Sequence, residues 1–219
     1  MELLSPLLDF VLHVDQHLAE LLADYGLWLY AIVFLVVFAE TGLVVTPFLP
    51  GDSLLFALGA LAAIDTSGTL TAPLLTVLLT VAAILGNTTN YAIGRRLGHI
   101  AMAGRLPLVS REHLRDTEAY YQRHGAMTLV LSRFAPILRT FAPFVAGIAG
   151  MHYGRFQAYS ISGAVLWVAS FVWAGYLFGN LPGVRDHFGL ITIGIIVVTL
   201  APAAIMAWRG WRRRRSAGR

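Results

Sequence analysis

The sequence predicts an all-α integral membrane protein built from two oppositely inserted re-entrant helical hairpins, about three full transmembrane helices and an N-terminal amphipathic helix. Three observations support this prediction. Of the 219 residues, 57% are hydrophobic and only 13% are charged, whereas a typical soluble domain has about 25% charged residues. Two long apolar runs are each interrupted near their middle by prolines and charged residues. The arginines concentrate in segments that this arrangement places on one side of the membrane.

Residues 1–26 are predicted to form an amphipathic helix at the membrane interface. Their apolar residues recur at helical spacing, with acidic residues between them. The segment carries five acids and no Arg or Lys. A secretory signal begins with basic residues, so we expect this segment to stay on the mature protein. His13 and His17 have metal-binding spacing, but no further ligand is nearby, which favours the interfacial interpretation.

The first hairpin spans residues 27–64 and contains the stretch FAETGLVVTPFLPGDSL. Its two apolar halves are too short to cross the membrane alone, because a spanning α-helix needs roughly 20 apolar residues. The break between them consists of Pro47, Pro50 and Gly51. Irregular backbone at such depth is tolerated only where protein buries it or where it lines a polar cavity. Glu40 and Asp52 flank the break, so the first functional hypothesis is a cavity that contains two carboxylates.

Residues 72–96 are predicted to form a full transmembrane helix, and residues 97–125 a polar cytoplasmic segment. The helix carries Asn87 and Asn90, and polar side chains within a membrane need partners. Together with Thr140 of the second hairpin, these residues are candidates for a polar substrate path. The alternative is that they only join neighbouring helices.

The second hairpin spans residues 126–151 and contains two arginines, Arg133 and Arg139. An arginine at membrane depth costs roughly 2.5 to 3.5 kcal/mol on insertion scales, so two of them demand anionic partners. They are six residues apart and do not share one straight helical face. We expect a hairpin break at Pro136 and Pro143 that lets both arginines point at one site. The alternative is a pair of arginines that extend to the membrane surface.

Two further transmembrane helices are predicted over residues 156–179 and 190–208, and a basic cytoplasmic tail over residues 209–219. If each hairpin returns to its own side, one face carries only Arg185, in the loop over residues 180–189. The other face carries most of the remaining arginines, in the polar segment and the tail. Because cytoplasmic loops are enriched in basic residues, we expect the C-terminus to be cytoplasmic.

The two halves of the chain resemble each other. Pro47, Gly59 and Tyr91–Gly94 correspond to Pro136, Gly147 and Tyr176–Gly179, with offsets of 89, 88 and 85 residues. Opposite insertion makes this an inverted repeat, and transporters with inverted repeats have their sites near the midplane, where broken helices meet. The expected N-caps of the second half-helices are Asp52, Ser53 and Thr140.

The motifs ETGLVVTPFLPGD and RFAPILRT, with NYAIGR and GAVLW, resemble the DedA family of bacterial inner-membrane proteins, which is related to the VTT, or SNARE-associated Golgi, proteins. The resemblance runs over nearly the whole chain. It implies transport of lipids across the membrane, with undecaprenyl phosphate and phospholipids as candidates, driven or gated by protons. The family's functional acids and arginines fall on Glu40, Asp52, Arg133 and Arg139. Where family members often have Asp, this chain has Asn87.

The leading hypothesis is a proton-coupled flippase for a lipid that carries a phosphate. Arg133 and Arg139 would bind the phosphate, since a guanidinium offers fixed paired donors. Glu40 and Asp52 would carry the coupling proton. The alternatives are a cation/proton antiporter, a structural membrane-homeostasis factor without transport, and an intramembrane lipid phosphatase, for which His152 is the nearby candidate residue.

The expected partners are the lipid bilayer, a phosphate-bearing lipid and protons, and the expected location is the bacterial inner membrane. We expect no enzymatic activity, no cofactor and no metal site, and the absence of cysteine excludes thiolate ligands. The basic tail indicates a membrane-surface anchor and not nucleic-acid binding. The sequence leaves the oligomeric state open, a homo-oligomer included.

Overall fold

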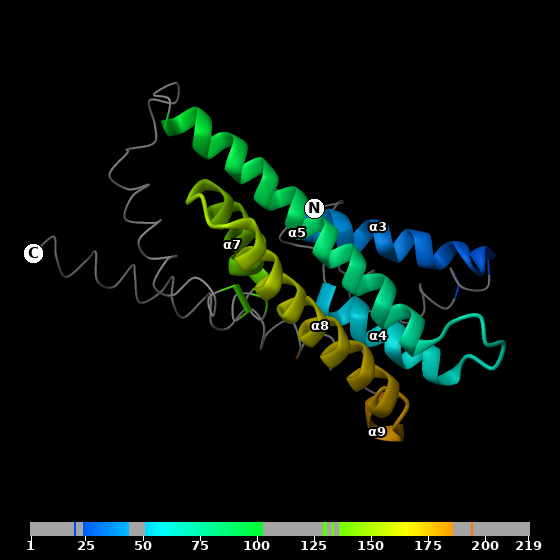
Figure 1. The fold of residues 1–219 in the computed structure, drawn as a ribbon. Helices are drawn as coiled ribbons and strands as arrows, with labels where there is room; N and C mark the ends of the chain where they lie inside the picture. Colours follow the sequence, from blue (N-terminus) through cyan, green and yellow to red (C-terminus); the bar gives the residue numbers. More distant parts are fainter. Residues whose placement is uncertain are drawn as a thin grey trace, which may run out of the picture.

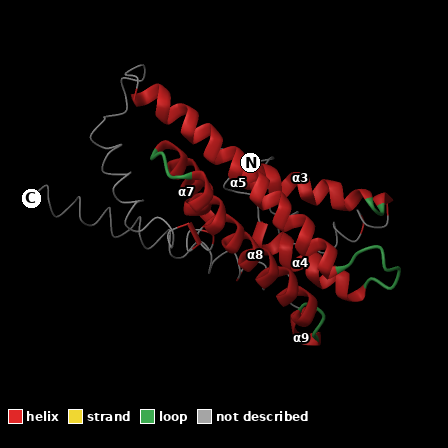
Figure 2. Ribbon diagram, in the orientation of Figure 1, coloured by secondary structure: helices red, strands yellow, loops and turns green. Residues whose placement is uncertain are grey.

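The computed structural model describes residues 20, 24–43, 51–102, 129–130, 133, 136–185 and 194. All regular secondary structure in these ranges is helical (Figure 2), which confirms the all-α prediction for the described part of the chain. Apart from residues 20, 24–26 and 194, the predictions for residues 1–26, 190–208 and 209–219 lie outside these ranges. Residues 103–125 of the predicted polar segment, Pro47 and Pro50 also lie outside them.

The first predicted hairpin consists of two short helices, α3 (Trp28–Gly42) and α4 (Gly51–Ile64). After α3 the backbone becomes extended at Leu43, whose N–H donates to the Ala39 carbonyl at 2.9 Å. Helix α4 begins at Gly51, the last residue of the expected break. The N-cap expected at Asp52 and Ser53 is therefore wrong, because both residues lie within the first turn.

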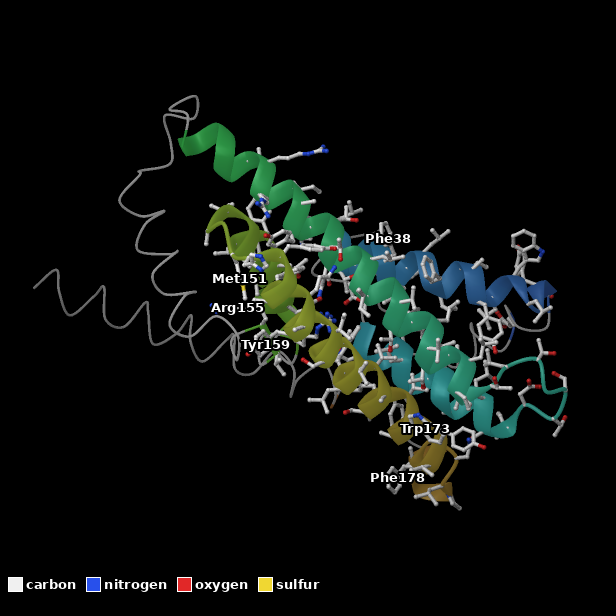
Figure 3. All side chains as sticks on the ribbon, viewed as in Figure 1. Phe38, Met151, Arg155, Tyr159, Trp173 and Phe178 are labelled. Atoms are coloured by element: carbon white, nitrogen blue, oxygen red, sulfur yellow. The ribbon has the colours of Figure 1, made fainter. Side chains whose placement is uncertain are left out.

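Two long helices, α5 (Ala72–Met102) and α8 (Tyr153–Phe178), match the predicted spans. Each is long and apolar enough to cross a membrane, yet only 39% and 33% of their most apolar windows are buried. The core helix of a soluble protein would be mostly buried, so these helices present apolar faces outward. Near the end of α8, Trp173 and Phe178 are exposed (Figure 3), as aromatic residues at a membrane interface are.

Helix α5 is longer than the sequence predicted, because it continues six residues beyond the expected end at residue 96. The start of the predicted polar segment is therefore helical. The added residues still pack within the protein. A Cβ at Gly98 would lie 2.7 Å from the carbonyl oxygen of Ile148, the last residue of α7 (Pro136–Ile148). A short helix, α9 (Pro182–Arg185), also lies in the predicted loop over residues 180–189.

The described part of the second hairpin is α7 (Pro136–Ile148). Pro136 is its first residue, a position where the missing proline N–H costs no helical hydrogen bond. Pro143 lies inside the helix, so the break expected there is wrong; one proline removes one backbone bond, which a packed helix tolerates. Thr140 is also interior and cannot be the expected N-cap.

Helix α7 ends at a glycine in the left-handed backbone region. Gly150 has a φ of +66°. Its N–H donates to the Gly147 carbonyl at 3.1 Å, and the Met151 N–H donates to the Ala146 carbonyl at 3.0 Å. These two bonds are those of a Schellman motif, which turns the chain from α7 into α8.

The second arm of each hairpin packs against the long helix of the other half of the chain, α4 on α8 and α7 on α5 (Figure 1). Glycines let these backbones approach closely. An added Cβ would collide with the Val172 backbone at Gly59, and with the Tyr91 backbone at Gly147. The correspondence of Gly59 with Gly147 is therefore confirmed.

The two long helices correspond with a different offset from the expected one. Gly175 of α8 lies against the Phe56 carbonyl, and Gly94 of α5 lies against the Phe144 carbonyl. Phe56 and Phe144 are 88 residues apart, like the hairpin glycines, so Gly94 corresponds to Gly175, 81 residues on. The expected match with Tyr176–Gly179 is wrong by four residues, because a shift of one helical turn keeps small residues on the same face.

The inner ends of both arms of the first hairpin lie near the middle of the long helices. At the outer end of α3, the Thr71 N–H donates to the Tyr30 hydroxyl at 3.0 Å, and at its inner end Gly42 lies against Gly86, near the middle of α5. At the outer end of α4, the Asn180 side chain donates to the Ala60 carbonyl at 2.7 Å. The outer ends of both arms therefore lie near the start of α5 and the end of α8 (Figure 1).

The loop between α4 and α5 is closed by Asp65. Its carboxylate accepts hydrogen bonds from the Ser67 hydroxyl and N–H and from the Leu70 N–H. These donors, the Ser67 hydroxyl first, hold the pKa of the Asp65 carboxyl below its usual range.

Candidate functional site

A buried ion-pair cluster lies where the inner ends of the hairpins meet. Arg139, the fourth residue of α7, donates through Nη1 to Asp52 Oδ1 at 2.7 Å and through Nη2 to Glu40 Oε1. All three side chains are less than a tenth exposed. Glu40 comes from the end of α3 and Asp52 from the first turn of α4. One guanidinium therefore joins both arms of the first hairpin to the second hairpin.

Trp167, in the middle of α8, completes this cluster. Its indole Nε1 donates to Asp52 Oδ1 at 2.8 Å, and its ring centroid lies 4.9 Å from Arg139 Cζ. The side chain is fully buried, so the cation–π contact with Arg139 is shielded from water. The sequence reasoning missed this role. The available signal was a tryptophan far from either helix end, whose N–H needs a partner inside the membrane.

Gly51 makes room for the Glu40 carboxylate at the start of α4. A Cβ at this position would collide with both carboxylate oxygens of Glu40. The N-terminus of a helix favours a negative charge, so α4 supports the carboxylate there. This close approach gives Gly51 a role beyond the expected hairpin break.

Arg133 is buried in a different way. Only 2% of it is exposed, and its Nη2 donates to the Ser160 carbonyl of α8 at 3.1 Å, with the Ser160 hydroxyl at 3.5 Å. No acceptor for its Nη1 and no carboxylate within ion-pair distance exist among the described residues. The positive charge of Arg139 also acts on it unfavourably. A Cβ at Gly163 would lie 3.1 Å from Arg133 Nε, so this glycine gives the arginine room.

The predicted polar-path residues have two different arrangements. Asn90 donates through Nδ2 to the carbonyls of Thr41, at 3.2 Å, and Thr140, at 2.7 Å. It therefore joins α3 to α7, which favours the helix-joining alternative for this residue. Asn87 donates instead to Ser160 Oγ at 3.0 Å and so belongs to the Arg133 group.

The structure therefore divides the predicted site residues into two groups. The first contains Glu40, Asp52 and Arg139, with Trp167 added. The second contains Arg133 and Asn87, joined through Ser160, which the sequence reasoning also missed. The expectation that both arginines face the two acids is met by Arg139 alone among the described residues.

Comparison with known proteins shows the family of this chain. The VTT domain model matches residues 49–177, a range that includes Asp52, both buried arginines and Trp167, while Glu40 precedes it. Protein DedA of Escherichia coli K12 is 52% identical over 206 residues, which cover 94% of each chain. The chain belongs to the DedA family of membrane proteins.

Two other relatives are less similar to this chain. An uncharacterized membrane protein of Mycobacterium leprae is 40% identical over 178 residues, covering 81% of this chain and 78% of the relative. The inner membrane protein YqjA of Escherichia coli K12 is 32% identical over 219 residues, covering 95% and 97%. No solved structure matches the chain.

Proposed function

We propose that this DedA-family protein is a proton-coupled transporter of a phosphate-bearing lipid in a bacterial inner membrane. The observation that carries the proposal is the unequal state of the two buried arginines. Arg139 binds two carboxylates, whereas Arg133 has an Nη1 without an acceptor among the described residues. A phosphate supplies the oxygen acceptors that a guanidinium fits best.

The charges of the site explain why lipid binding would be linked to protons. Arg133 and Arg139 formally balance Glu40 and Asp52, so the buried site is neutral. A bound monoanionic phosphate would leave one excess negative charge in a medium of low dielectric, which is costly. Uptake of one proton by a carboxylate restores neutrality and releases one of the bonds that hold Arg139. The released guanidinium can then turn to the phosphate.

We propose further that both hairpins are re-entrant and that the C-terminus is cytoplasmic. The supporting observation is that α3 ends, and α4 begins, near the middle of the long helices. The chain has no cysteine, so single cysteines can be introduced and labelled. Ser67→Cys and Asn180→Cys should react in intact cells, and Arg111→Cys and Ser216→Cys only after permeabilisation. Labelling of Arg111→Cys in intact cells would refute this topology.

Lipid flipping in proteoliposomes tests the function directly. Fluorescent analogues of undecaprenyl phosphate and of phospholipids serve as probes, with and without an imposed pH gradient. Glu40→Gln and Asp52→Asn mimic the protonated acids, so we expect both variants to bind lipid but to lose the dependence of flipping on the gradient. If both variants respond to the gradient like the parent, the proposed proton coupling is wrong.

The specific alternative is a structural factor without transport, favoured by the way Arg139 joins both hairpins. Exchanging the charges in the variant Glu40→Gln, Asp52→Arg, Arg139→Glu tests this alternative, because Glu40→Gln keeps a second carboxylate away from the new one. The structural role would be supported by two results together: the variant recovers stability and full function in cells, and the parent protein shows no lipid flipping in proteoliposomes.

A further inference from the structure

A second set of buried polar groups, apart from the Arg139 cluster, keeps polar atoms that have no hydrogen-bond partner among the described residues. Arg133, Asn87 and Ser160 are each less than a twentieth exposed. Asn87 and Arg133 meet at the Ser160 hydroxyl oxygen, Oγ. This atom accepts from Asn87 Nδ2 at 3.0 Å and lies 3.5 Å from Arg133 Nη2. We call these three residues the Ser160 group.

The unsatisfied atoms of the Ser160 group are of two kinds. Arg133 Nη1 is a donor for which no acceptor exists among the described residues. The Ser160 hydroxyl accepts from Asn87 and has one hydrogen of its own to donate. Asn87 Oδ1 is an acceptor, also without a donor there. Buried polar groups are rarely left unpaired, because each one costs free energy comparable to a lost hydrogen bond. The group is therefore complementary to a ligand that both accepts and donates.

We infer that the Ser160 group selects an anionic phosphate that also presents a hydrogen-bond donor of its own. The phosphate oxygens would accept from Arg133 and the Ser160 hydroxyl, while the ligand's donor would satisfy Asn87 Oδ1. This inference rests on the proposed function and narrows its substrate class. The donor has two chemical sources, the P–OH of a singly ionised phosphate monoester or a hydroxyl on the headgroup of a phosphodiester.

The surroundings of Arg133 fix the guanidinium for this task. The Ser160 carbonyl accepts from Nη2, and the backbone at Gly163 leaves room for Nε. Nη1 is therefore the guanidinium nitrogen that has no acceptor among the described residues. Arg133 is enclosed in this structure, and alternating access supplies the opening through which the ligand reaches it. Asn87 and Ser160 thus act as specificity residues, whereas the Arg139 cluster carries the proton response.

Ligand-induced thermal stabilisation of the purified full-length protein in neutral detergent tests the inference. Three single-chain probes are compared at pH 5, where a phosphate monoester with a second pKa of about 6 is mostly singly charged: dodecyl phosphate carries P–OH, dodecyl 2-hydroxyethyl phosphate carries a headgroup hydroxyl, and dodecyl methyl phosphate carries neither. We expect at least one donor-bearing probe to bind the parent roughly tenfold more tightly than dodecyl methyl phosphate, as one buried hydrogen bond implies. The stronger of the two donor-bearing probes names the source of the donor.

Two variants and their controls test which residues make the protein prefer the donor-bearing probes. Asn87→Leu should bind all three probes equally, because it removes the acceptor. Ser160→Ala should weaken all three, because it removes a donor to the phosphate. Thr80→Val, a buried change on α5, and Ser170→Ala, an exposed change on α8, should bind like the parent.

The outcomes separate this inference from the proposed function. Equal binding of the three probes to the parent, or unchanged selection in Asn87→Leu, overturns the Ser160 group while phosphate binding stands. No binding of any probe to the parent overturns the proposed function and the inference with it. The probe series on the parent decides the question even if a variant fails to fold.

Discussion

Arg139 and Arg133 lie six residues apart on the second hairpin and are both almost completely buried, yet their surroundings differ. Arg139 binds two carboxylates and lies over the Trp167 ring. Arg133 binds one backbone carbonyl and has no carboxylate partner among the described residues. A buried charge is expensive unless it is paired. The pairing at Arg139 therefore stabilises the fold, whereas the missing pairing at Arg133 is a cost that a functional ligand would explain.

The comparison predicts unequal losses of stability for one substitution made at both positions. Arg139→Gln leaves Glu40 and Asp52 as buried carboxylates without their cation, so we expect a loss of roughly 3–5 kcal/mol in the free energy of unfolding. Arg133→Gln removes a charge that contacts no carboxylate among the described residues, but it leaves one excess negative charge in the site, so we expect a clearly smaller loss than for Arg139→Gln. Both variants should lose lipid flipping, measured beside thermal unfolding in detergent. Equal destabilisation by the two substitutions would contradict the comparison.

Gly51→Ala disturbs the Arg139 cluster without changing a charge. The new methyl group would displace the Glu40 carboxylate from Arg139, at a cost of roughly 1–3 kcal/mol, as overpacking typically has. Gly183→Ala is the control, since a Cβ at Gly183 meets nothing within 4 Å. Thermal unfolding measures both variants. If they unfold at the same temperature, Glu40 does not depend on the space at Gly51.

Trp167→Phe has the smallest expected effect. It keeps an aromatic ring near Arg139 but removes the indole N–H that donates to Asp52. We expect a loss of about 0.5–1.5 kcal/mol, the net value of one hydrogen bond. Trp173→Phe, an exposed change on the same helix, is the control. A loss as large as that of Arg139→Gln would mean that the ring, and not the ion pair, holds the hairpins together.

The sequence predicted much of the architecture, because membrane helices follow directly from apolar length. Helix α8 was expected over residues 156–179 and lies at Tyr153–Phe178. The sequence also predicted that buried acids and arginines would need each other, and Arg139 fulfils this. It could not show which arginine pairs with the acids. That choice depends on how α7 lies along α5, which close contacts such as Gly94 with Phe144 determine.

The roles of Ser160 and Trp167 were not predicted from the sequence. Ser160 and Trp167 lie within the apolar run of α8, where the hydropathy pattern treats them as ordinary members of a span. Their roles appear only when α4, α5 and the arginines surround them in space. The interior position of Pro143 was also hidden, because packing tolerates a proline that local propensity disfavours.

The exchange of partners between the two halves has a consequence for how the protein folds during synthesis. When the chain has been made as far as Met102, α4 has not yet met α8, against which its Gly59 surface will pack. The packing surface of α4 therefore stays uncovered until α8 has been synthesised. The final docking step then joins segments more than 100 residues apart in sequence. Long-range docking is slow, and during this interval α4 can dock on the α8 of another copy. Overproduction should therefore favour dimers with exchanged halves, in which every interface of the monomer is retained.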